Sequence, residues 1–417
     1  MGERLKNLLL AVLLLLMIGL LGVTMVLSMR DSQRGAQLVE AFEQKESGGV
    51  RLAASQTAAF PEKLGLILDE GCFYALDGES YRLLWQQVRP LYEEALGSGA
   101  ALTRMEESEF RRLLRAPAVL LQYHAPQPFA LLQDWGGTQS SDETAVRSAA
   151  MTVRDGGVIL LVTDETGGRW STETAASAAE LESICSGGWT VNAALAGEDY
   201  PQLGWDELLT REVLSLPGVS VQTPEYAQRG ELPQRVITLF SMNAFLTKVY
   251  RNADGSLVYV ESHGTIRLAA DGDLHYSGTS ADLELAEKQG AAARAEICQK
   301  VYALLEQLWQ VTGASGRLSL EEIREDEEGW VLRFGLESDG LFFERSEGSW
   351  AVAQVKNGVL TQLHVSPRTL SVTGEDMLLP MTQAASALPE GNARLCVRLT
   401  QQGQTLFAPV ICRVTEE

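Results

Sequence analysis

The sequence predicts an α+β protein with an N-terminal transmembrane helix, a mixed α/β-type domain and a C-terminal region of helices packed on antiparallel sheet. Three observations lead to this fold class. An uncharged apolar segment covers residues 8–29. Helix-like and strand-like patterns then alternate over 61–232, as in mixed sheet domains. From 233 to 417, short strands separated by glycine turns surround a few helices, and their order hints at a duplicated helix-on-sheet unit.

The apolar segment is long enough to cross a membrane. Leu8–Met29 comprises 22 residues without a charge, about 33 Å of helix, and a hydrocarbon core is about 30 Å thick. A cleaved signal peptide has a shorter apolar stretch and ends in small residues. Val26–Arg30 offers no such cleavage site. We therefore expect an uncleaved signal anchor.

Charges around the segment favour a cytoplasmic N-terminus by a small margin. Arg4 and Lys6 precede the segment, whereas Arg30 and Arg34 follow it, and basic residues tend to stay on the cytoplasmic side. We expect residues 1–30 to form a cytoplasmic tip and single-pass anchor in the cell membrane. The bulk of the chain is then extracytoplasmic.

One face of this helix is a candidate contact surface for a partner helix. Gly19 and Gly22 would allow another backbone to approach closely, although their spacing differs from G-x-x-x-G. Glycine is also frequent in membrane helices in general, so both interpretations stay open. The residues on this face are Ala11, Leu15, Ile18, Gly19, Gly22 and Val26.

The mixed domain follows a small, polar juxtamembrane stalk at 31–60. Apolar residues at helical spacing predict an amphipathic helix over Ser80–Leu96. Thr103 and Glu106 have the spacing of a capping box, which predicts a short helix through Leu114. The predicted strands are Lys63–Leu68, Val119–Tyr123 and Val158–Val162.

The C-terminal region begins with two hairpins, at Asp254-Gly255 and Asp271-Gly272. A long helix is expected at Ala281–Val311, because apolar residues recur every three or four positions. A shorter helix is expected at Pro380–Leu388. The predicted strands are Thr247–Arg251, Leu257–Glu261, Thr265–Leu268, Leu274–Tyr276, Trp330–Leu336, Leu341–Arg345, Trp350–Lys356, Val359–His364, Arg394–Leu399 and Thr405–Val414.

Charge and cysteine content exclude some classes of protein. The formal net charge is −21, which disfavours nucleic-acid binding because phosphate contacts need Lys and Arg. The five cysteines form no C-x-x-C pair, and their odd number does not suit a disulfide scaffold. Cys396 and Cys412 are expected to face each other in the last hairpin, with pairing left open.

No motif in the sequence indicates an enzyme, a cofactor or a metal. Nucleophile elbows, zinc-protease helices, P-loops and dinucleotide-binding turns are absent from the sequence. Asp271, Asp273 and His275 are the closest-spaced metal-ligand types, but we interpret them as a solvated turn, since a site needs four or more ligands. The acidic cluster at Glu321–Glu328 is interpreted as a solvated loop.

Several stretches resemble the YycH/YycI family of two-component-system regulatory proteins of Gram-positive bacteria. The resemblance covers the architecture of an N-terminal span followed by a large extracytoplasmic part. It is carried locally by soft patterns of aromatic and glycine positions rather than by a catalytic signature. These stretches are Phe245–Tyr250, Tyr259–Glu261, Gly264–Leu268, Gly272–Tyr276, Leu379–Met381 and Phe407–Val410.

The resemblance implies a non-enzymatic regulator that associates with a sensor histidine kinase of the cell envelope, by contact between spans and by ectodomain binding. A related YycI-like protein is a second expected partner. It supplies no active-site residues. Two alternatives remain: an extracytoplasmic binding module for an envelope ligand or protein, with the span as a tether, and an envelope hydrolase whose paired carboxylates the sequence cannot identify.

Overall fold

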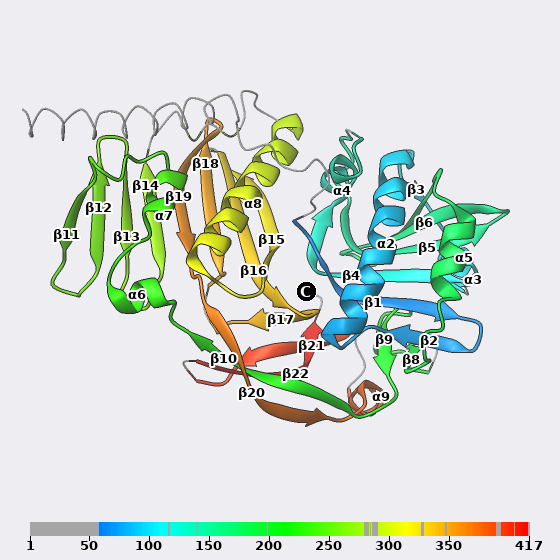
Figure 1. Ribbon diagram of the computed structural model, residues 1–417. Helices are drawn as coiled ribbons and strands as arrows, with labels where there is room; N and C mark the ends of the chain where they lie inside the picture. The colour runs from blue at the N-terminus through cyan, green and yellow to red at the C-terminus, as the bar shows by residue number, and fades with distance from the viewer. Residues whose placement is uncertain are drawn as a thin grey trace, which may run out of the picture. The chain divides into compact units, whose positions relative to one another are not determined.

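A computed structural model describes residues 58–115, 117–138, 140–197, 199–278, 283, 285, 291–326, 329–346, 348–388, 393–403 and 405–415. The predicted membrane segment, its six candidate contact residues and nearly all of the predicted stalk lie outside these residues. None of the helices in the described ranges combines the length and apolar character needed to span a bilayer. The mixed α+β class is confirmed, because these ranges contain two sheets and eight helices (Figure 1).

The first sheet has nine strands in the order β3-β7-β6-β5-β4-β1-β2-β8-β9. All its pairings are antiparallel, so the alternation of helix and strand in the sequence did not produce parallel crossovers. Its strands are β1 (Pro61–Leu68), β2 (Gly71–Tyr74), β3 (Thr103–Arg104), β4 (Ala118–Pro128), β5 (Ala145–Arg154), β6 (Gly157–Asp164), β7 (Arg169–Glu173), β8 (Ala193–Leu195) and β9 (Leu208–Thr210).

Four helices belong to this part of the chain: α2 (Gly78–Ser98), α3 (Glu107–Leu113), α4 (Phe129–Trp135) and α5 (Ala178–Cys185). The predicted amphipathic helix is α2, whose first turn is capped by the Asp77 carboxylate accepting from the Ser80 amide at 2.8 Å. The predicted capping box of α3 is wrong, although the helix exists. Thr103 pairs with Ser171 of β7 instead, and Glu106 occupies the cap position without a side-chain bond.

The second sheet has thirteen strands in the order β11-β12-β13-β14-β19-β18-β16-β17-β21-β22-β10-β20, with β15 beside β16. Its strands are β10 (Leu214–Gln222), β11 (Lys248–Arg251), β12 (Leu257–Glu261), β13 (Gly264–Leu268), β14 (Leu274–Gly278), β15 (Arg317–Asp326), β16 (Gly329–Ser338), β17 (Leu341–Glu344), β18 (Ala351–Lys356), β19 (Val359–Val365), β20 (Thr369–Leu378), β21 (Ala393–Gln401) and β22 (Leu406–Thr415). Its helices are α6 (Glu225–Arg229), α7 (Gln234–Leu239), α8 (Ala291–Thr312) and α9 (Met381–Ser386).

The acidic cluster predicted as a solvated loop is largely a strand. β15 extends through Asp326 and pairs with β16 along its whole length. Its first half buries Leu318 and Leu320, and its second half carries a cross-strand charge pair, Arg333 Nε to Glu322 at 2.8 Å. Backbone pairing along the whole strand and this charge pair therefore hold an acidic sequence in the sheet.

The last hairpin has the expected register. Cys396 lies directly opposite Cys412, and both thiols are free. The Cys412 thiol contacts Glu344 of β17 at 3.5 Å, and β17 pairs with β21 in parallel. β17 thus brings Glu344 beside the hairpin.

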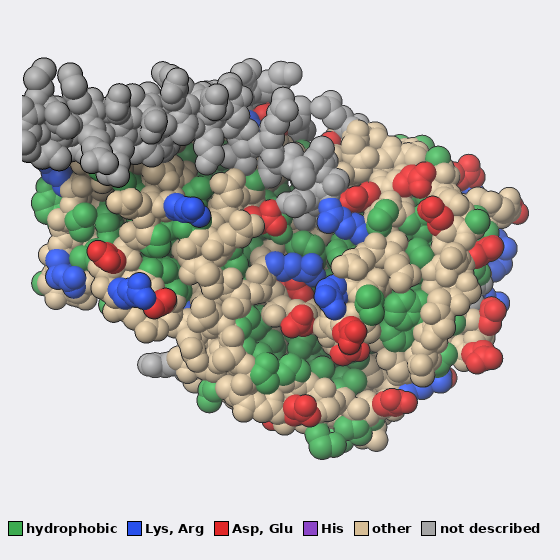
Figure 2. All heavy atoms as spheres, viewed as in Figure 1, with side chains coloured by type: hydrophobic (Ala, Val, Ile, Leu, Met, Phe, Trp, Pro, Cys, Tyr) green, Lys and Arg blue, Asp and Glu red, His purple; other side chains and the backbone are tan. Residues whose placement is uncertain are grey.

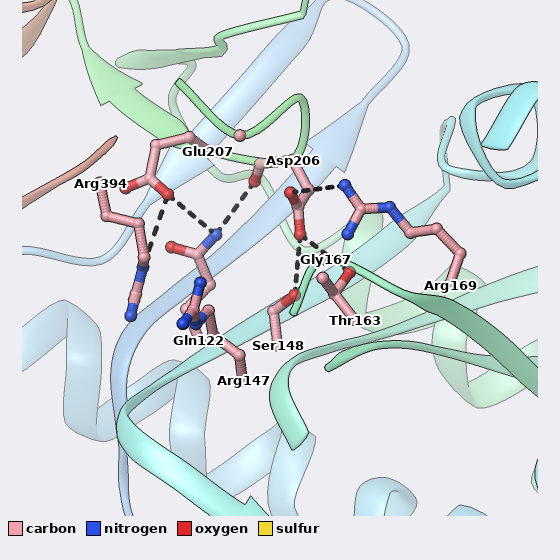
Figure 3. Close-up of a pocket in the computed structure, with 10 residues that line it drawn as sticks. Gln122, Arg147, Ser148, Thr163, Gly167, Arg169, Asp206, Glu207 and Arg394 are labelled. Carbon is pink, nitrogen blue, oxygen red and sulfur yellow. Dashed lines mark hydrogen bonds and ion pairs between the residues drawn. The ribbon is translucent and has the colours of Figure 1, made fainter. Parts of the chain in front are cut away.

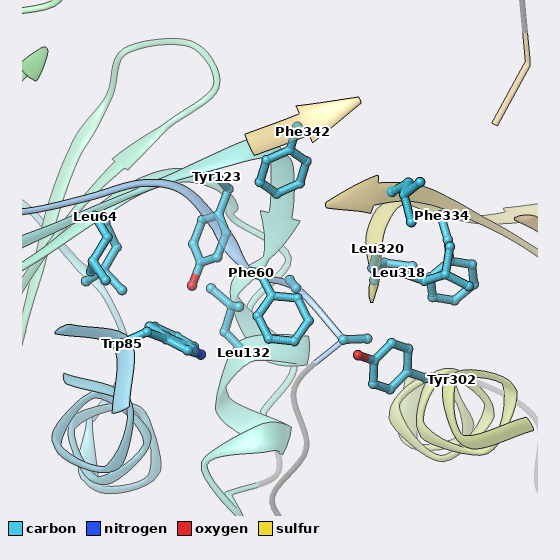
Figure 4. Packing of buried hydrophobic residues seen from close by; sticks show 14 of the residues in the cluster. Phe60, Leu64, Trp85, Tyr123, Leu132, Tyr302, Leu318, Leu320, Phe334 and Phe342 are labelled. Carbon is cyan, nitrogen blue, oxygen red and sulfur yellow. The ribbon is translucent and has the colours of Figure 1, made fainter. Parts of the chain in front are cut away.

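One hydrophobic core continues from the first sheet to the second. Phe60, just before β1, stacks edge-on against Trp85 of α2 with ring centroids 6.3 Å apart. Its backbone amide donates to Ser319 of β15 at 3.2 Å. Tyr302 of α8 packs against Phe334 of β16 at 6.3 Å, as Figure 4 shows. The entry of the chain into β1 therefore ties the two sheets together.

Candidate functional site

Figure 3 shows a polar pocket on the face of the first sheet that β21 approaches. Strands β4 to β7 supply its floor, and the loop between β8 and β9 covers it. Buried polar side chains are rare on a sheet face unless they are hydrogen-bonded, so their concentration here marks the site. The lining residues are Gln122, Arg147, Ser148, Thr163, Gly167, Arg169, Gly204, Asp206, Glu207 and Arg394.

Asp206 is held by three strands of the floor. Its Oδ2 accepts from Ser148 Oγ at 2.7 Å and from Thr163 Oγ1 at 3.3 Å. Its Oδ1 lies 4.0 Å from Arg169 Nη2. The side-chain amide of Gln122 donates to the Asp206 carbonyl at 3.2 Å. The covering loop is thus fixed to the sheet by its backbone and by one carboxylate.

Glu207 connects the pocket to a deeper set of charges. It pairs with Lys63 Nζ, and its Oε2 lies 3.8 Å from Arg394 Nε. Arg394 also approaches Glu62, at 3.8 Å. We call the connected set the buried ion network; it comprises Glu62, Lys63, His124, Glu207, Arg394 and Arg398.

An irregularity in β1 allows two successive side chains to enter this network. In a regular strand Glu62 and Lys63 would point to opposite faces. The pairing with β4 shifts register between Pro61 and Lys63, as at a β-bulge, where an extra residue re-aims its neighbours. Glu62 and Lys63 are 4% and 0% exposed. The bulge therefore places a buried acid and a buried base side by side.

Glu62 is the centre of the network. It accepts from Arg398 Nε at 2.6 Å, and it lies 3.3 Å from His124 Nδ1. Burial acts to raise the pKa of Glu62, but Arg398 and His124 together hold it well below its usual range. For His124, burial acts to lower the pKa, and hydrogen bonds to Glu321 and Glu62 raise it above its ordinary value. Glu62 is thus ionised, with cations on several sides.

Lys63 is a member of the network with a pKa near neutral pH. Burial first, and then the neighbouring charge of Arg394, lower its pKa to about 7. Both effects penalise a buried ammonium. Near neutral pH, the positive charge of the network therefore changes with the protonation of Lys63, which depends on its burial and on the charge of Arg394.

The arrangement suits binding better than nucleophilic catalysis. The pocket lining contains no His or Cys among the described residues, and Ser148 donates to a carboxylate rather than to a general base of the usual kind. The nearby Cys396 is buried and its pKa is raised, first by burial and then by Glu62. That thiol is a poor nucleophile.

A second group of titratable residues lies on the other sheet. The histidine cluster consists of Asp273, His275 and His364, whose ligand atoms lie within 4.8 Å of one another. His275 and His364 are register partners on β14 and β19, with rings stacked at 4.3 Å. The sequence had pointed to Asp271 as the third member, but the sheet supplies His364.

The histidine cluster has an internal cation already. Arg368 Nη2 donates to Asp273 Oδ1 at 2.6 Å, and His364 Nε2 lies 3.2 Å from Oδ2. Burial acts to raise the pKa of Asp273, but His364 and Arg368 lower it strongly. The side chains of Asp273, His275 and His364 could together ligate a metal ion. However, Arg368 already neutralises the one carboxylate among them.

Sequence reasoning did not find the pocket or the buried ion network. One local signal was present: Arg394, Cys396 and Arg398 occupy one face of a strand whose other residues are mostly apolar. Polar residues on the inward face of a buried strand indicate a polar network. The predicted membrane-contact residues lie outside the described residues, so the structure brings none of them to this site.

Comparison with known proteins supports the fold and leaves the activity open. No protein-family model matches the sequence, and no curated protein matches it. Among solved structures, the fold is similar to the crystal structure of YycH from Bacillus subtilis, with a TM-score of 0.56 and 10% sequence identity. The similarity covers 87% of this chain and 98% of that chain. At this identity the likeness concerns the fold alone.

Proposed function

We propose that this protein is a non-enzymatic, membrane-anchored regulator of a cell-envelope two-component sensor histidine kinase in a Gram-positive bacterium. The observation that carries the proposal is the fold similarity, which takes in 98% of the YycH chain. The apolar segment Leu8–Met29 supplies the anchor. The kinase is the expected partner, and a YycI-like protein is the second.

Regulation of this kind requires a coupling free energy between the binding of the regulator and the equilibrium between two states of the kinase. The regulator must bind one state better than the other, because equal affinity for both shifts nothing. Gly19 and Gly22 offer a close-approach surface inside the bilayer. Contact between spans would then favour one arrangement of the kinase helices.

An exposed sheet edge supports a contact outside the membrane as well. β11 is an end strand of the second sheet, and all four of its residues are exposed. Beside it, Phe245 and Leu246 are 81% and 67% exposed. Open strand edges and exposed apolar side chains are surfaces that proteins use to bind one another.

Figure 2 shows acidic and basic side chains interspersed over the visible face.

Photo-crosslinking in native membranes tests the transmembrane contact. A crosslinker placed at Gly19 or Gly22 is expected to capture the sensor kinase, identified by mass spectrometry. In the predicted helix, the spacing of Leu13 and Leu20 puts them on the opposite face, and they are the matched controls. Equal capture from both faces, or none from either, would contradict a specific contact between spans.

The second candidate function is an envelope binding module whose span is only a tether. The polar pocket on the first sheet favours it, because three buried polar atoms of its lining have no hydrogen-bond partner among the described residues. Replacement of residues 8–29 by an unrelated apolar helix separates the two. Unchanged kinase output would leave the ectodomain as the active part.

A further inference from the structure

Exposed apolar side chains gather at the two open edges of the second sheet. Ten large apolar side chains among the described residues are exposed, and seven of them lie in or next to the end strands β11 and β20. An open strand edge with apolar side chains is a template for pairing with another strand. The seven are Phe245, Leu246, Val249 and Tyr250 at β11, and Val372, Met377 and Leu379 at β20.

The two edges carry opposite charges. β11 contains two bases, Lys248 and Arg251, and no acid. β20 contains two acids, Glu375 and Asp376, and no base. Glu375 accepts a hydrogen bond from Ser215 at 2.8 Å, and none of these four charged groups is in an ion pair with another described residue. Successive side chains of a strand alternate between its faces, so each edge presents one charge on each face.

One antiparallel register brings these opposite charges together. A partner strand that places Asp376 opposite Lys248 also places Glu375 diagonal to Arg251. Diagonal neighbours on one face are within reach of long side chains. The register shift of β20 against β10 falls before the stretch Gly374–Leu378, so both acids lie in the regular part of the strand.

The complementary edge belongs to a second copy of the chain. In one copy, β11 and β20 are the opposite ends of the sheet and lie apart in Figure 1. Two β11 strands facing each other would oppose bases to bases, and two β20 strands would bring acids close to acids. Like charges across a strand pair are destabilising, so the head-to-tail contact is favoured over contact between identical edges.

We propose that β11 of one copy pairs with β20 of a second copy, so that the second sheet continues from one ectodomain into the next. Lys248 and Arg251 then contact Asp376 and Glu375 of the neighbouring copy. β11 has only four residues, so one contact is small. Anchoring in a common bilayer strengthens it by raising the effective concentration. This self-association goes beyond kinase regulation and rests on the proposed anchor for its strength alone.

Energy transfer between copies in liposomes tests the association. Full-length protein labelled at its N-terminus with a donor or an acceptor dye is reconstituted at several lipid-to-protein ratios. Flotation with the liposomes tests the anchor separately, and protein that does not float is measured in free solution. Transfer is expected to exceed that of randomly distributed copies and to fall as salt is raised, because salt screens exposed ion pairs. Random transfer at every ratio would overturn the proposal.

Charge reversal tests the pairing of the two edges. Lys248→Glu/Arg251→Glu makes both edges acidic, and Glu375→Lys/Asp376→Lys makes both edges basic. Each variant alone is expected to associate at least tenfold more weakly than the unaltered protein. An equimolar mixture of the two variants is expected to recover association, because each variant supplies the edge that the other needs.

The matched control for the first reversal is Arg82→Glu/Arg112→Glu, at exposed positions of α2 and α3. It makes the same change in net charge and should leave association unaltered. Association through the transmembrane segment would survive the reversals at both edges. Survival of that kind, or equal weakening by the control, would contradict pairing of β11 with β20.

A photo-crosslinker at Val249 identifies the partner strand. It is expected to form an adduct with residues 369–379 of a second copy. Leu83, an exposed apolar side chain of α2, is the matched control position and should give no such adduct. Adducts between two β11 strands would show that identical edges meet. Adducts with another protein alone, the kinase included, would assign the edge to that protein, and either result would overturn the proposal.

Discussion

The buried ion network and the histidine cluster assemble the same kinds of side chain under opposite conditions. In the network, Glu62 is 4% exposed and Lys63 0%. In the histidine cluster, His275 is exposed and the side chain of His364 is 34% exposed, whereas the side chain of Asp273 is 14% exposed. Both groups join residues from strands that are distant in sequence. The strongest difference is the exposure of His275 and His364 to water.

This difference decides what each group contributes. Exposed charges are solvated and screened, so their pairing changes stability little. A buried charge depends on its protein partners, and removal of one partner leaves the other uncompensated. We therefore expect large energetic effects from the buried ion network and small ones from the two histidines of the histidine cluster. Each prediction below breaks or sharpens that contrast.

The largest effect is expected from Glu62→Leu. This change leaves Arg398 without the carboxylate that accepts from it at 2.6 Å, and it removes the charge opposite Arg394. The free energy of unfolding should fall by about 3–5 kcal/mol, as for a broken buried ion pair. Urea denaturation followed by tryptophan fluorescence measures the change.

Two further variants interpret that loss. Glu62→Leu/Arg398→Met removes both charges and is expected to recover part of the stability, because apolar replacement of a whole buried pair is often neutral. Glu173→Gln removes one partner of the exposed pair with Arg154 and should change stability by less than about 1 kcal/mol. A loss as large in Glu173→Gln would remove the distinction between buried and exposed charges.

The fold was more predictable from the sequence than the site was, because the residues that form the site are far apart along the sequence. The amphipathic helix at Ser80–Leu96 and the hairpin at Asp254-Gly255 are encoded by neighbours, through periodicity and turn residues. The contact between Glu62 and Arg398 joins residues 336 positions apart. No local pattern encodes it, and it depends on a register shift in β1 that composition does not reveal.

The strands that the sequence reading missed have a related cause. β10 contains Pro217 and Gly218, which usually exclude a strand, yet it pairs with β20 throughout its length with a register shift after Gly218. β15 carries several acidic residues, pairs with β16 along its whole length, and has one of its acids, Glu322, paired with Arg333 of β16. In both cases tertiary pairing overrides local preference.

A metal-binding experiment gives the next largest effect. Arg368 donates to Asp273 at 2.6 Å, and we expect it to weaken Zn²⁺ binding by the histidine cluster. Arg368→Met should bind Zn²⁺ at least tenfold more tightly than the unaltered protein, because Asp273, His275 and His364 then form an uncompensated set of N and O ligands. Titration against a chelating dye measures the affinities.

The control for zinc is His275→Gln in the Arg368→Met background, which removes one ligand and should reverse the gain. Equal zinc affinity with and without Arg368 would mean that the guanidinium does not govern the cluster. Tight binding by the unaltered protein would contradict the view that the cluster is satisfied internally.

The smallest expected effect is the pH dependence of stability, which should have opposite signs at the two histidines. The pKa of His124 is raised in the folded protein by Glu321 and Glu62, so its contribution is present below about pH 6.5 and is lost as pH rises through the folded pKa. The pKa of His275 is lowered, first by burial and then by His364. Its contribution is present above about pH 6.5 and is lost as pH falls through the folded pKa.

Variants separate these two contributions, because the other titrating groups cancel in the difference from the unaltered protein. His124→Gln should reduce the loss of stability that accompanies rising pH above 6.5. His275→Gln should reduce the loss that accompanies falling pH below 6.5, and by less, since His275 is exposed. Urea denaturation at pH 5 to 8 measures both slopes. Slopes of the same sign would show that the local partners of each ring do not control its charge. The expected contrast between His124 of the buried ion network and exposed His275 would then be wrong.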